Sequence, residues 1–431
     1  MLQLLLLLFT ASDSSAASAA ISGNCSSIIH LTREYAFYDP LISRAINNTF
    51  PTATSDQPTT VTIGPSFFES FQIFPNTRYI QGFNQGKNGT ATITSLLHQA
   101  DLACYAIGSN LHLWEPGNEN DLAPGSYWPA NWTLADYMAE WREKTASVVK
   151  QLQESCPGVE TRFLGPSFAW VHYAVSGLEP VEAFEMESPS TLQGTLMNHS
   201  SIVSSISKHV NFSQILTNLD LPFILGKSNS ISGQGSNGLT NFFDSALWPL
   251  DYDLWCTSQN IKRIHHHQGL NYRYASWQPI ASHGIPPTTR PPYYANIMVA
   301  RILDRARDTE LLNIPRESDT EAVYAIYDNS VIARLVVIDL EEYKAAELYE
   351  RPSRVYSFCV PEGCRGAKVE RLDAEGSNAT EGVSVGEVVY DYALAEGRPV
   401  VRNEMGASMQ MQGGVLTVEV WVSQAVLVSL F

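Results

Sequence analysis

The 431-residue sequence lacks any uninterrupted apolar run of about 18 residues, the length that a membrane-spanning helix needs. Internal repeats and low-complexity linkers are also absent. What is present is a hydrophobic fraction of 44% and an aromatic fraction of 10%, which suit large folded cores rather than a disordered chain. At this length the chain can hold two or three domains, or one large barrel and a smaller domain.

Positive charge is scarce. The chain has 27 Lys and Arg residues against 44 Asp and Glu residues, which gives a formal net charge of −17. Such a balance argues against partners made of nucleic acid and against an anionic membrane surface. It also disfavours electrostatic capture of a long sulfated polyanion.

Motifs of several enzyme classes are missing. The sequence has no Gly-x-Ser-x-Gly elbow, and Gly233-Gln234-Gly235 lacks the Lys-Ser/Thr that follows a phosphate-binding loop. The cysteine spacing fits no zinc pattern. On a strand, His265 and His267 share one face while His266 points the other way, so only two ligands would meet. We therefore predict neither a metal site nor a cofactor.

The first 20 residues predict a secretory signal peptide. An apolar run, Leu2 to Phe9, is followed by small residues that resemble an Ala-x-Ala exit. No Lys or Arg precedes the run, so a wrongly assigned start of the chain is the alternative. Seven Asn-X-Ser/Thr triplets suit an N-glycosylated, secreted protein, and they begin at Asn24, Asn47, Asn88, Asn131, Asn198, Asn211 and Asn378.

An even number of cysteines, six, permits disulfides in a secreted chain. Several pairings are possible. Cys359 and Cys364 flank Val-Pro-Glu-Gly, and a local bridge between them is the one that we expect first.

The hydrophobic pattern divides the chain near residue 305. Residues 21–305 alternate apolar strand-like runs with amphipathic segments, which predicts βα units and a parallel sheet. Residues 306–431 alternate apolar and polar positions, as in Val331–Ile338, which predicts an antiparallel β-sandwich. The clearest helix is predicted over Leu134–Leu152, with Thr133 as its N-cap.

Five strands are expected in the first part, and each ends in glycine, asparagine or another polar residue. They are Tyr79–Asn84, the segment around Trp114, Arg162–Gly165, the segment around Phe223, and Ile261–His267. A retaining glycosidase needs two carboxyl groups about 5–5.5 Å apart, and a barrel can supply them from the ends of two distant strands. The Trp114 strand ends in Asn118-Glu119. The Phe223 strand ends where a second carboxylate would complete the site, but the residue there is Lys227.

Many ordered segments resemble glycoside hydrolase family 79, the β-glucuronidase and heparanase-like enzymes, and especially its fungal secreted members. They include Ile63–Ser70, Gly82–Thr90, Trp114–Asp121, Thr191–His199, Leu221–Ser230, His267–Gly269, Tyr272–Tyr274, Arg290–Tyr294 and, in the C-terminal part, Arg334–Pro361 and Glu396–Pro399. The resemblance implies a (β/α)8 TIM-type barrel with a C-terminal β-sandwich. It also implies hydrolysis of a glucuronic-acid-containing glycan or glucuronide by a retaining, two-carboxylate route.

The resemblance implies a role for each site residue. Glu119 would be the acid/base, and Asn118 would hydrogen-bond the 2-hydroxyl of the sugar. Tyr272 and Tyr274 would help to bind the substrate carboxylate. Lys227 aligns with the family nucleophile, in Gly-Lys-Ser-Asn-Ser where the family has Gly-Glu-(Thr/Ala)-Asn-Ser.

A lysine at the nucleophile position predicts impaired activity. An ammonium group cannot form the glycosyl ester on which the retaining route depends. If it lay close to Glu119, it would also pair with that carboxylate and spoil it as an acid. Glu185 or Glu187 could substitute in principle, but a surface role suits both better. The alternative to an impaired hydrolase is an inactive glycan-binding pseudoenzyme, and a third reading is a purely structural secreted glycoprotein.

Other departures concern the barrel. Pro116 and Asn120 replace the usual Leu and Pro around Gly117 and Glu119, and a proline inside a central strand removes a ladder donor. The family's first strand and most of its second should precede Tyr35, and the stretch 169–190 looks shortened. We therefore expect a barrel that is incomplete at its N-terminus, through gene decay or a mis-spliced gene model. Oligomeric state is left open.

Overall fold

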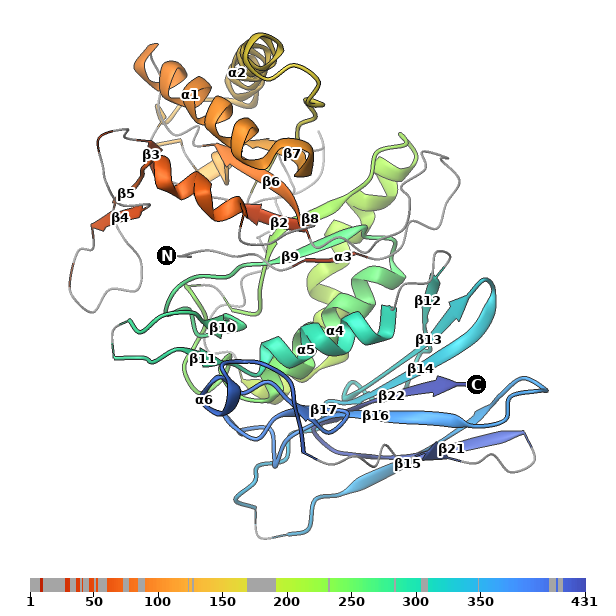
Figure 1. Ribbon diagram of the computed structural model, residues 1–431. Helices are drawn as coiled ribbons and strands as arrows, with labels where there is room; N and C mark the ends of the chain where they lie inside the picture. The colour runs from red at the N-terminus through yellow and green to blue at the C-terminus, as the bar shows by residue number, and fades with distance from the viewer. Residues whose placement is uncertain are drawn as a thin grey trace. The chain divides into compact units, whose positions relative to one another are not determined.

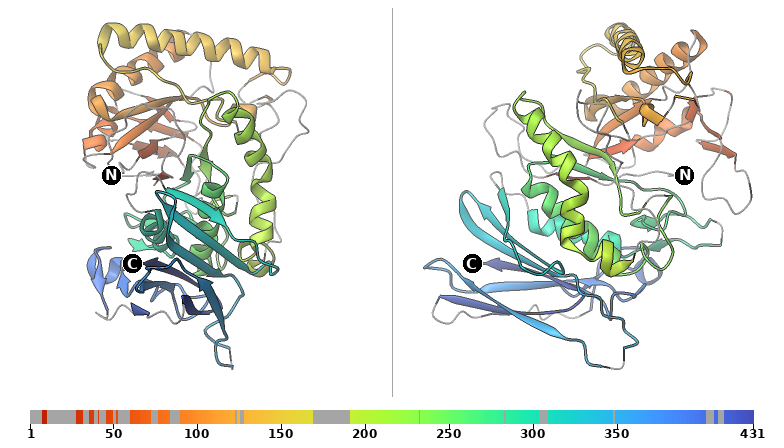
Figure 2. Two further views of the ribbon diagram at one scale, coloured as in Figure 1. Left: turned by 90° about the vertical axis from the view of Figure 1, so that its right-hand side faces the viewer. Right: turned by 180° about the vertical axis from the view of Figure 1, so that it is seen from behind.

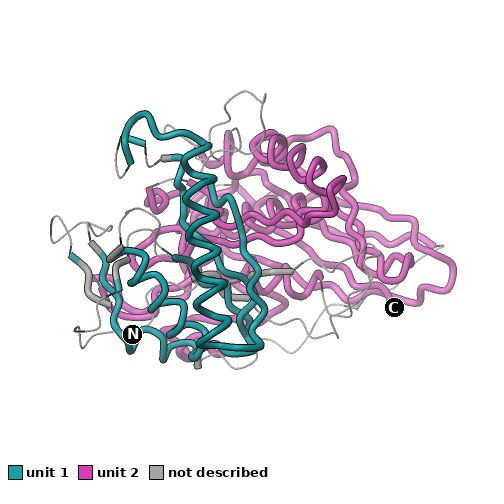
Figure 3. The backbone as a smooth tube through the Cα atoms, turned by 90° about the horizontal axis from the view of Figure 1, so that it is seen from above, with its two compact units in different colours: residues 1–8, 26–183 teal, residues 9–25, 184–431 magenta. Residues whose placement is uncertain are grey.

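The structure is a computed structural model that describes residues 8–10, 28–31, 36–38, 41, 46–49, 52, 60–72, 77–83, 90–122, 124–125, 128–168, 191–231, 233–282, 284–303, 309–347, 349–402, 408–409 and 414–431. The chain forms two compact units, residues 1–8 with 26–183 and residues 9–25 with 184–431 (Figure 3).

The first unit is built on a parallel sheet covered by helices (Figure 1). Its strands run in the order β2 (Ile28–Leu31), β6 (Arg78–Phe83) and β7 (Leu111–Pro116), and all neighbours are parallel. The remaining elements are β3 (Ala36–Tyr38), β4 (Ile46–Thr49), β5 (Thr60–Ile63), η1 (Pro65–Gln72), α1 (Thr90–Ile107), η2 (Gly108–Asn110), η3 (Asn120–Leu122) and α2 (Leu134–Ser155). Phenylalanines of η1 pack with α1, β6 and β7 in one core.

Helix α2 confirms the helix predicted from residue 134. Thr133 Oγ1 accepts the Asp136 amide while the Asp136 carboxylate accepts the Thr133 amide, so both ends of a capping box are present. Tyr137, Val148 and Leu152 of the predicted apolar stripe are buried.

The disulfide prediction was wrong. Cys104 of α1 is bridged to Cys156, which follows α2, whereas Cys359 and Cys364 are free. Cys359 lies at the end of a strand in register with Val415, and the Cys364 thiol donates to the carbonyl of Gly366. The strand register and the hydrogen bond to Gly366 thus hold these two thiols in separate contacts. The packing of α1 on α2 instead brings Cys104 and Cys156 together.

The second unit begins with helices and parallel strands. β8 (Ile224–Ser228) pairs in parallel with β9 (Arg263–His266), and β1 (Leu8–Thr10) completes that sheet. The other elements are the π-helical turn η5 (Leu192–Leu196), α3 (His199–Thr217), α4 (Asp244–Ser258), β10 (Trp277–Gln278), β11 (Thr288–Thr289) and α5 (Pro292–Leu303). Most of α4 is buried, on every side of the helix.

The second unit ends in a β-domain, which confirms the antiparallel sandwich (Figure 2). Among the described residues, its large sheet has nine strands: β12 (Thr309–Asn313), β13 (Glu321–Asp328), β14 (Val331–Asp339), β22 (Gln424–Leu430), β16 (Ala367–Asp373), β17 (Ser384–Val385), β18 (Val388–Val389), β19 (Val400–Val401) and β20 (Ser408–Met409). A second sheet pairs β15 (Ser353–Cys359) with β21 (Val415–Trp421), and the short helix α6 spans Tyr392–Ala395.

The large sheet buries both of its faces. Alternate residues of β13, such as Tyr324 and Ile326, pack with α4 and α5, whereas Val323 and Ala325 pack against β15 and β21. This is the two-residue period of a strand, with one core on each side.

Parallel strands covered by helices support the predicted α/β class. Four of the five expected strands are present as β6, β7, β8 and β9, and Phe163 makes only an isolated parallel bridge to Trp114. Closure of the strands into a (β/α)8 barrel, and its incompleteness, stay predictions. Of the expected signal peptide, only Leu8–Thr10 is described, as β1; Glu185 and Glu187 lie outside the described residues. None of the helices in the described ranges is long and apolar enough to cross a membrane.

Candidate active site

Glu119 occupies a strained backbone position at the end of the turn that follows β7. Its φ angle is +48°, in the left-handed region that residues other than glycine seldom adopt. Its amide donates to the carbonyl of Ser167 at 2.7 Å, and Ser167 itself has a φ of +54°. The segment after α2 thus holds the Glu119 backbone in place. Such over-determined strain is concentrated at functional sites.

The turn between β7 and Glu119 requires glycine at position 117. Gly117 has a φ of +86°, and a Cβ atom there would lie 2.1 Å from Nδ2 of the buried Asn120. The Gly117 amide donates to the carbonyl of Phe83 at 2.9 Å. Pro116 therefore ends the strand, and the next residue supplies a ladder donor. The proline that sequence reasoning found disruptive is accommodated at the strand end.

Asn118 presents an amide without an acceptor. Its Nδ2 atom is buried, and no described group accepts a hydrogen bond from it. Buried polar groups are nearly always bonded, so an orphan beside a candidate acid suits a ligand hydroxyl.

Sequence reasoning missed a second carboxylate, Glu115, on β7. Its side chain is buried, and Ser167 Oγ donates to its Oε1 at 2.6 Å. Burial and then the charge of Glu115 raise the pKa of Tyr137, whose hydroxyl donates to the carbonyl of Pro166. Glu115 and Tyr137 thus fix the segment that carries Ser167. The only signal in the sequence was a charged residue inside an apolar strand.

Lys227 lies in an irregular part of β8. Leu225 pairs with Ile264 and Ser228 pairs with His266, so two residues of β8 oppose one residue of β9. This is a β-bulge, a device that re-aims side chains and is common beside active sites. Lys227 is partly buried.

The residues after Lys227 are held by hydrogen bonds. Ser228 Oγ donates to the Tyr252 hydroxyl at 2.7 Å, and the Ser228 carbonyl accepts the His267 amide at 2.8 Å. Asn229 Nδ2 donates to the carbonyl of His267 at 2.9 Å. The end of β8 is therefore tied to α4 and to the end of β9, which leaves position 227 little freedom.

Tyr272 and Tyr274 come together around His267. Their ring centroids are 5.8 Å apart, and the Tyr274 hydroxyl shares a 2.9 Å hydrogen bond with His267 Nδ1. A Cβ atom on Gly269 would lie 2.2 Å from the Tyr272 ring, so glycine is required for this packing. His267 links the tyrosines to Ser228 and Asn229, a role that spacing alone did not indicate.

Arg290 brings a positive charge to the tyrosine loop. Its Nη2 donates to Gln278 Oε1 at 3.3 Å, and Gln278 in turn exchanges hydrogen bonds with Asn271. Burial and then the charge of Arg273 lower the pKa of Arg290 to about 10. Its Nη1 is buried and has no acceptor among the described residues. A buried guanidinium without a carboxylate favours an anionic ligand nearby.

The three consecutive histidines have different surroundings. His266 Nε2 lies 2.8 Å from Asp253, His267 bonds Tyr274, and His265 is fully buried. Within the described ranges, no three His, Cys, Asp or Glu side chains form a group that could hold a metal ion.

The site residues therefore form two groups. Asn118 and Glu119 lie together in the first unit and offer a carboxyl group and an amide. Lys227, Tyr272 and Tyr274 lie in the second unit and offer an ammonium group and two phenols around His267.

Comparison with known proteins identifies the family. A β-glucuronidase of Aspergillus niger is 39% identical over 445 residues, which covers 93% of this chain and 82% of the relative. The chain belongs to glycoside hydrolase family 79. A β-glucuronidase of Neurospora crassa is 36% identical over 434 residues, covering 86% of this chain and 78% of that protein. The family 79 C-terminal β-domain matches residues 323–427, within the sandwich described above.

A solved structure is similar to this chain over most of its length. The 4-O-α-L-rhamnosyl-β-D-glucuronidase of Fusarium oxysporum, solved as a complex with Rha-GlcA, superposes with a TM-score of 0.77. The match covers 94% of this chain and 88% of that chain at 20% identity, which supports the fold.

Proposed function

We propose that this chain is a secreted β-glucuronidase-like glycoside hydrolase homologue whose activity is impaired because Lys227 replaces the nucleophile. Two curated relatives are β-glucuronidases, which supports a glucuronide or glucuronic-acid-containing glycan as the ligand. The observation that carries the proposal is the lysine at the bulged end of β8. Its neighbours Gly226, Asn229 and Ser230 keep the family pattern.

The remaining residues have roles in the retaining mechanism. Glu119 would protonate the leaving oxygen, and Asn118 would bind the 2-hydroxyl. Tyr272 and Tyr274 would bind the uronate carboxylate, with the charge of Arg290 nearby. Lys227 would stop the retaining mechanism at its first step, the formation of a glycosyl ester on the enzyme, because an amine cannot form that ester.

The alternative function is binding without hydrolysis. The ordered contacts of His267 with both tyrosines and the orphan amide of Asn118 favour it, because they need no nucleophile. A pseudoenzyme should bind an aryl β-glucuronide, whereas a purely structural glycoprotein should bind none.

The deciding experiment compares hydrolysis of a chromogenic β-glucuronide by the unmodified protein and by Lys227→Glu. We expect kcat/KM to rise by about three orders of magnitude or more in the variant. The matched control is Lys262→Glu, an identical charge change at a lysine that donates to Asn260, which should restore nothing. Adding Glu119→Gln to Lys227→Glu should abolish the gain.

Each outcome has a clear meaning. Activity in the unmodified protein would show that Lys227 does not stand at the nucleophile position. If neither protein hydrolyses the glucuronide although circular dichroism shows that both are folded, Lys227 is not the sole cause of the impaired activity. Calorimetry with the same glucuronide then separates the binding alternative from the structural one.

A further inference from the structure

The β-domain carries a surface pocket of about 420 Å³. Trp421, Tyr343, Arg351, Asp373, Glu375 and Ser384 line it. These residues come from the end of β21, the end of β16, the start of β17 and the segment after β14. None of the candidate site residues named above is among the residues that line the pocket.

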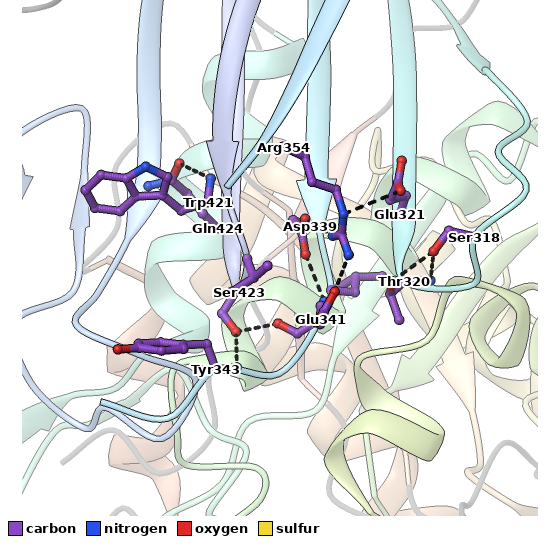
Figure 4. A network of polar contacts seen from close by, with 12 residues as sticks. Ser318, Thr320, Glu321, Asp339, Glu341, Tyr343, Arg354, Trp421, Ser423 and Gln424 are labelled. Carbon is purple, nitrogen blue, oxygen red and sulfur yellow. Dashed lines mark hydrogen bonds and ion pairs between the residues drawn. The ribbon is translucent and has the colours of Figure 1, made fainter. Parts of the chain in front are cut away.

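The turn between β21 and β22 positions both aromatic side chains (Figure 4). Ser423 is fully buried with a φ of +54°, and its Oγ accepts the Tyr343 amide at 2.9 Å. The same hydroxyl donates to the Glu341 carbonyl at 2.7 Å, while the Trp421 amide donates to Gln424 Oε1 at 3.3 Å. The backbones at Tyr343 and Trp421 are thus tied to one rigid turn.

Arg351 holds the two rings in the pocket wall. Its guanidinium carbon lies 5.5 Å from the Trp421 ring centre and 5.8 Å from that of Tyr343. Its nitrogens donate to the carbonyls of Val422, Ser423 and Ala374, and it forms an ion pair with Asp373 at 3.1 Å. The guanidinium therefore fills the cationic position over both rings from within the protein.

What remains for a ligand is an aromatic surface beside oxygen acceptors. Trp421 is 44% exposed although it is a large apolar side chain. Glu375 is exposed and Asp373 is partly exposed, so both carboxylates can accept hydrogen bonds from hydroxyl groups. The C–H groups of a sugar ring suit the electron-rich face of an indole, and its hydroxyls suit carboxylates.

We propose that this pocket is an accessory site that binds a neutral sugar residue of a glycan chain. Arg351 is paired with Asp373, which leaves the carboxylate of Glu375 to repel a uronate or a sulfate ester. The pocket thus favours a neutral sugar, whereas the tyrosine loop near Arg290 favours an anionic one. It would hold the protein on the neutral part of a glycan, whether or not Lys227 permits hydrolysis.

The test is isothermal titration of the full chain with neutral hexasaccharides of xylose, glucose, mannose and galactose. The protein is first treated with an endoglycosidase, because Asn378 begins a predicted glycosylation triplet close to the pocket. The Asn378 side-chain oxygen accepts the Ala345 amide at 3.1 Å, two residues after Tyr343 of the pocket wall. We expect at least one hexasaccharide to bind in the millimolar range or tighter. Trp421→Ala should weaken that binding about tenfold or more, and Trp421→Phe should keep much of it.

Two further variants isolate the chemistry. Val355→Ala removes an exposed apolar side chain from β15, in the same two-stranded sheet, and should bind like the unmodified protein. Glu375→Gln should weaken the neutral sugar several-fold. Thermal unfolding of each variant verifies its fold.

Three results would overturn the proposal: no binding of any neutral hexasaccharide at millimolar concentration, equal binding by Trp421→Ala and Val355→Ala, or Trp421-dependent binding of only an oligouronate. None of them bears on glucuronide hydrolysis by Lys227→Glu, so the two proposals fail independently.

Discussion

At the scale of single residues, a buried ion pair joins three elements of the second unit. His199 of α3 shows this clearly, because its Nδ1 lies 2.9 Å from the Asp251 carboxylate, which also accepts the Tyr324 hydroxyl. Burial alone lowers the pKa of His199, but the hydrogen bond and charge of Asp251 outweigh it, so the net pKa is raised. Helices α3 and α4 and strand β13 meet at this group.

The ion pair of His199 predicts a pH-dependent stability. A histidine whose folded pKa is raised adds stability that is complete below the unfolded pKa of about 6.5 and is lost as the pH rises through the folded value. His199→Gln should therefore lower the free energy of unfolding by about 2 kcal/mol at about pH 5, and by less in alkaline solution. Urea unfolding at several pH values measures this. A pH-independent difference would contradict it.

The residue scale also limits what a sequence can reveal. The lysine at position 227 is visible in the sequence, but its meaning came from a family resemblance and not from local pattern. Local pattern could not reveal the roles of Glu115, Ser167 and His267, because these roles depend on contacts between segments far apart in the chain.

At the scale of elements, local signals were the most informative. The helix from Leu134 was predictable because the capping box and the 3.6-residue period lie within one segment. Strands β6, β7, β8 and β9 were predictable from apolar runs ending in polar residues. The pairing of Cys104 with Cys156 was not, because it joins residues 52 apart through the packing of α1 on α2.

The disulfide between α1 and α2 predicts a stability contribution. Changing Cys104 and Cys156 together to alanine should reduce the free energy of unfolding by about 2–4 kcal/mol, because the bridge restricts the unfolded chain. Denaturant unfolding measures the loss. The control is Cys359→Ser with Cys364→Ser, which removes two free thiols and should change little. Equal losses in both double variants would reject the assignment.

At the scale of the molecule, the compartment in which the protein resides stays a prediction. We propose secretion with N-glycosylation, which the Cys104–Cys156 disulfide supports because such bridges persist in oxidising compartments. Asn131 and Asn211 are exposed, as an attached glycan requires. A fungal expression host should release the protein into the medium, and an endoglycosidase should lower its apparent mass. An intracellular protein with no mass shift would contradict this proposal.

The large sheet of the β-domain has a consequence for how such a protein can evolve. One of its faces packs against β15 and β21, and the other face forms the core that α4 and α5 share. A recombination break between α5 and β12 would separate the helices from the large sheet, and each of the two resulting proteins would expose the apolar surface of this shared core. We therefore expect the β-domain to fold only together with α4 and α5, and to be exchanged between proteins only with those helices.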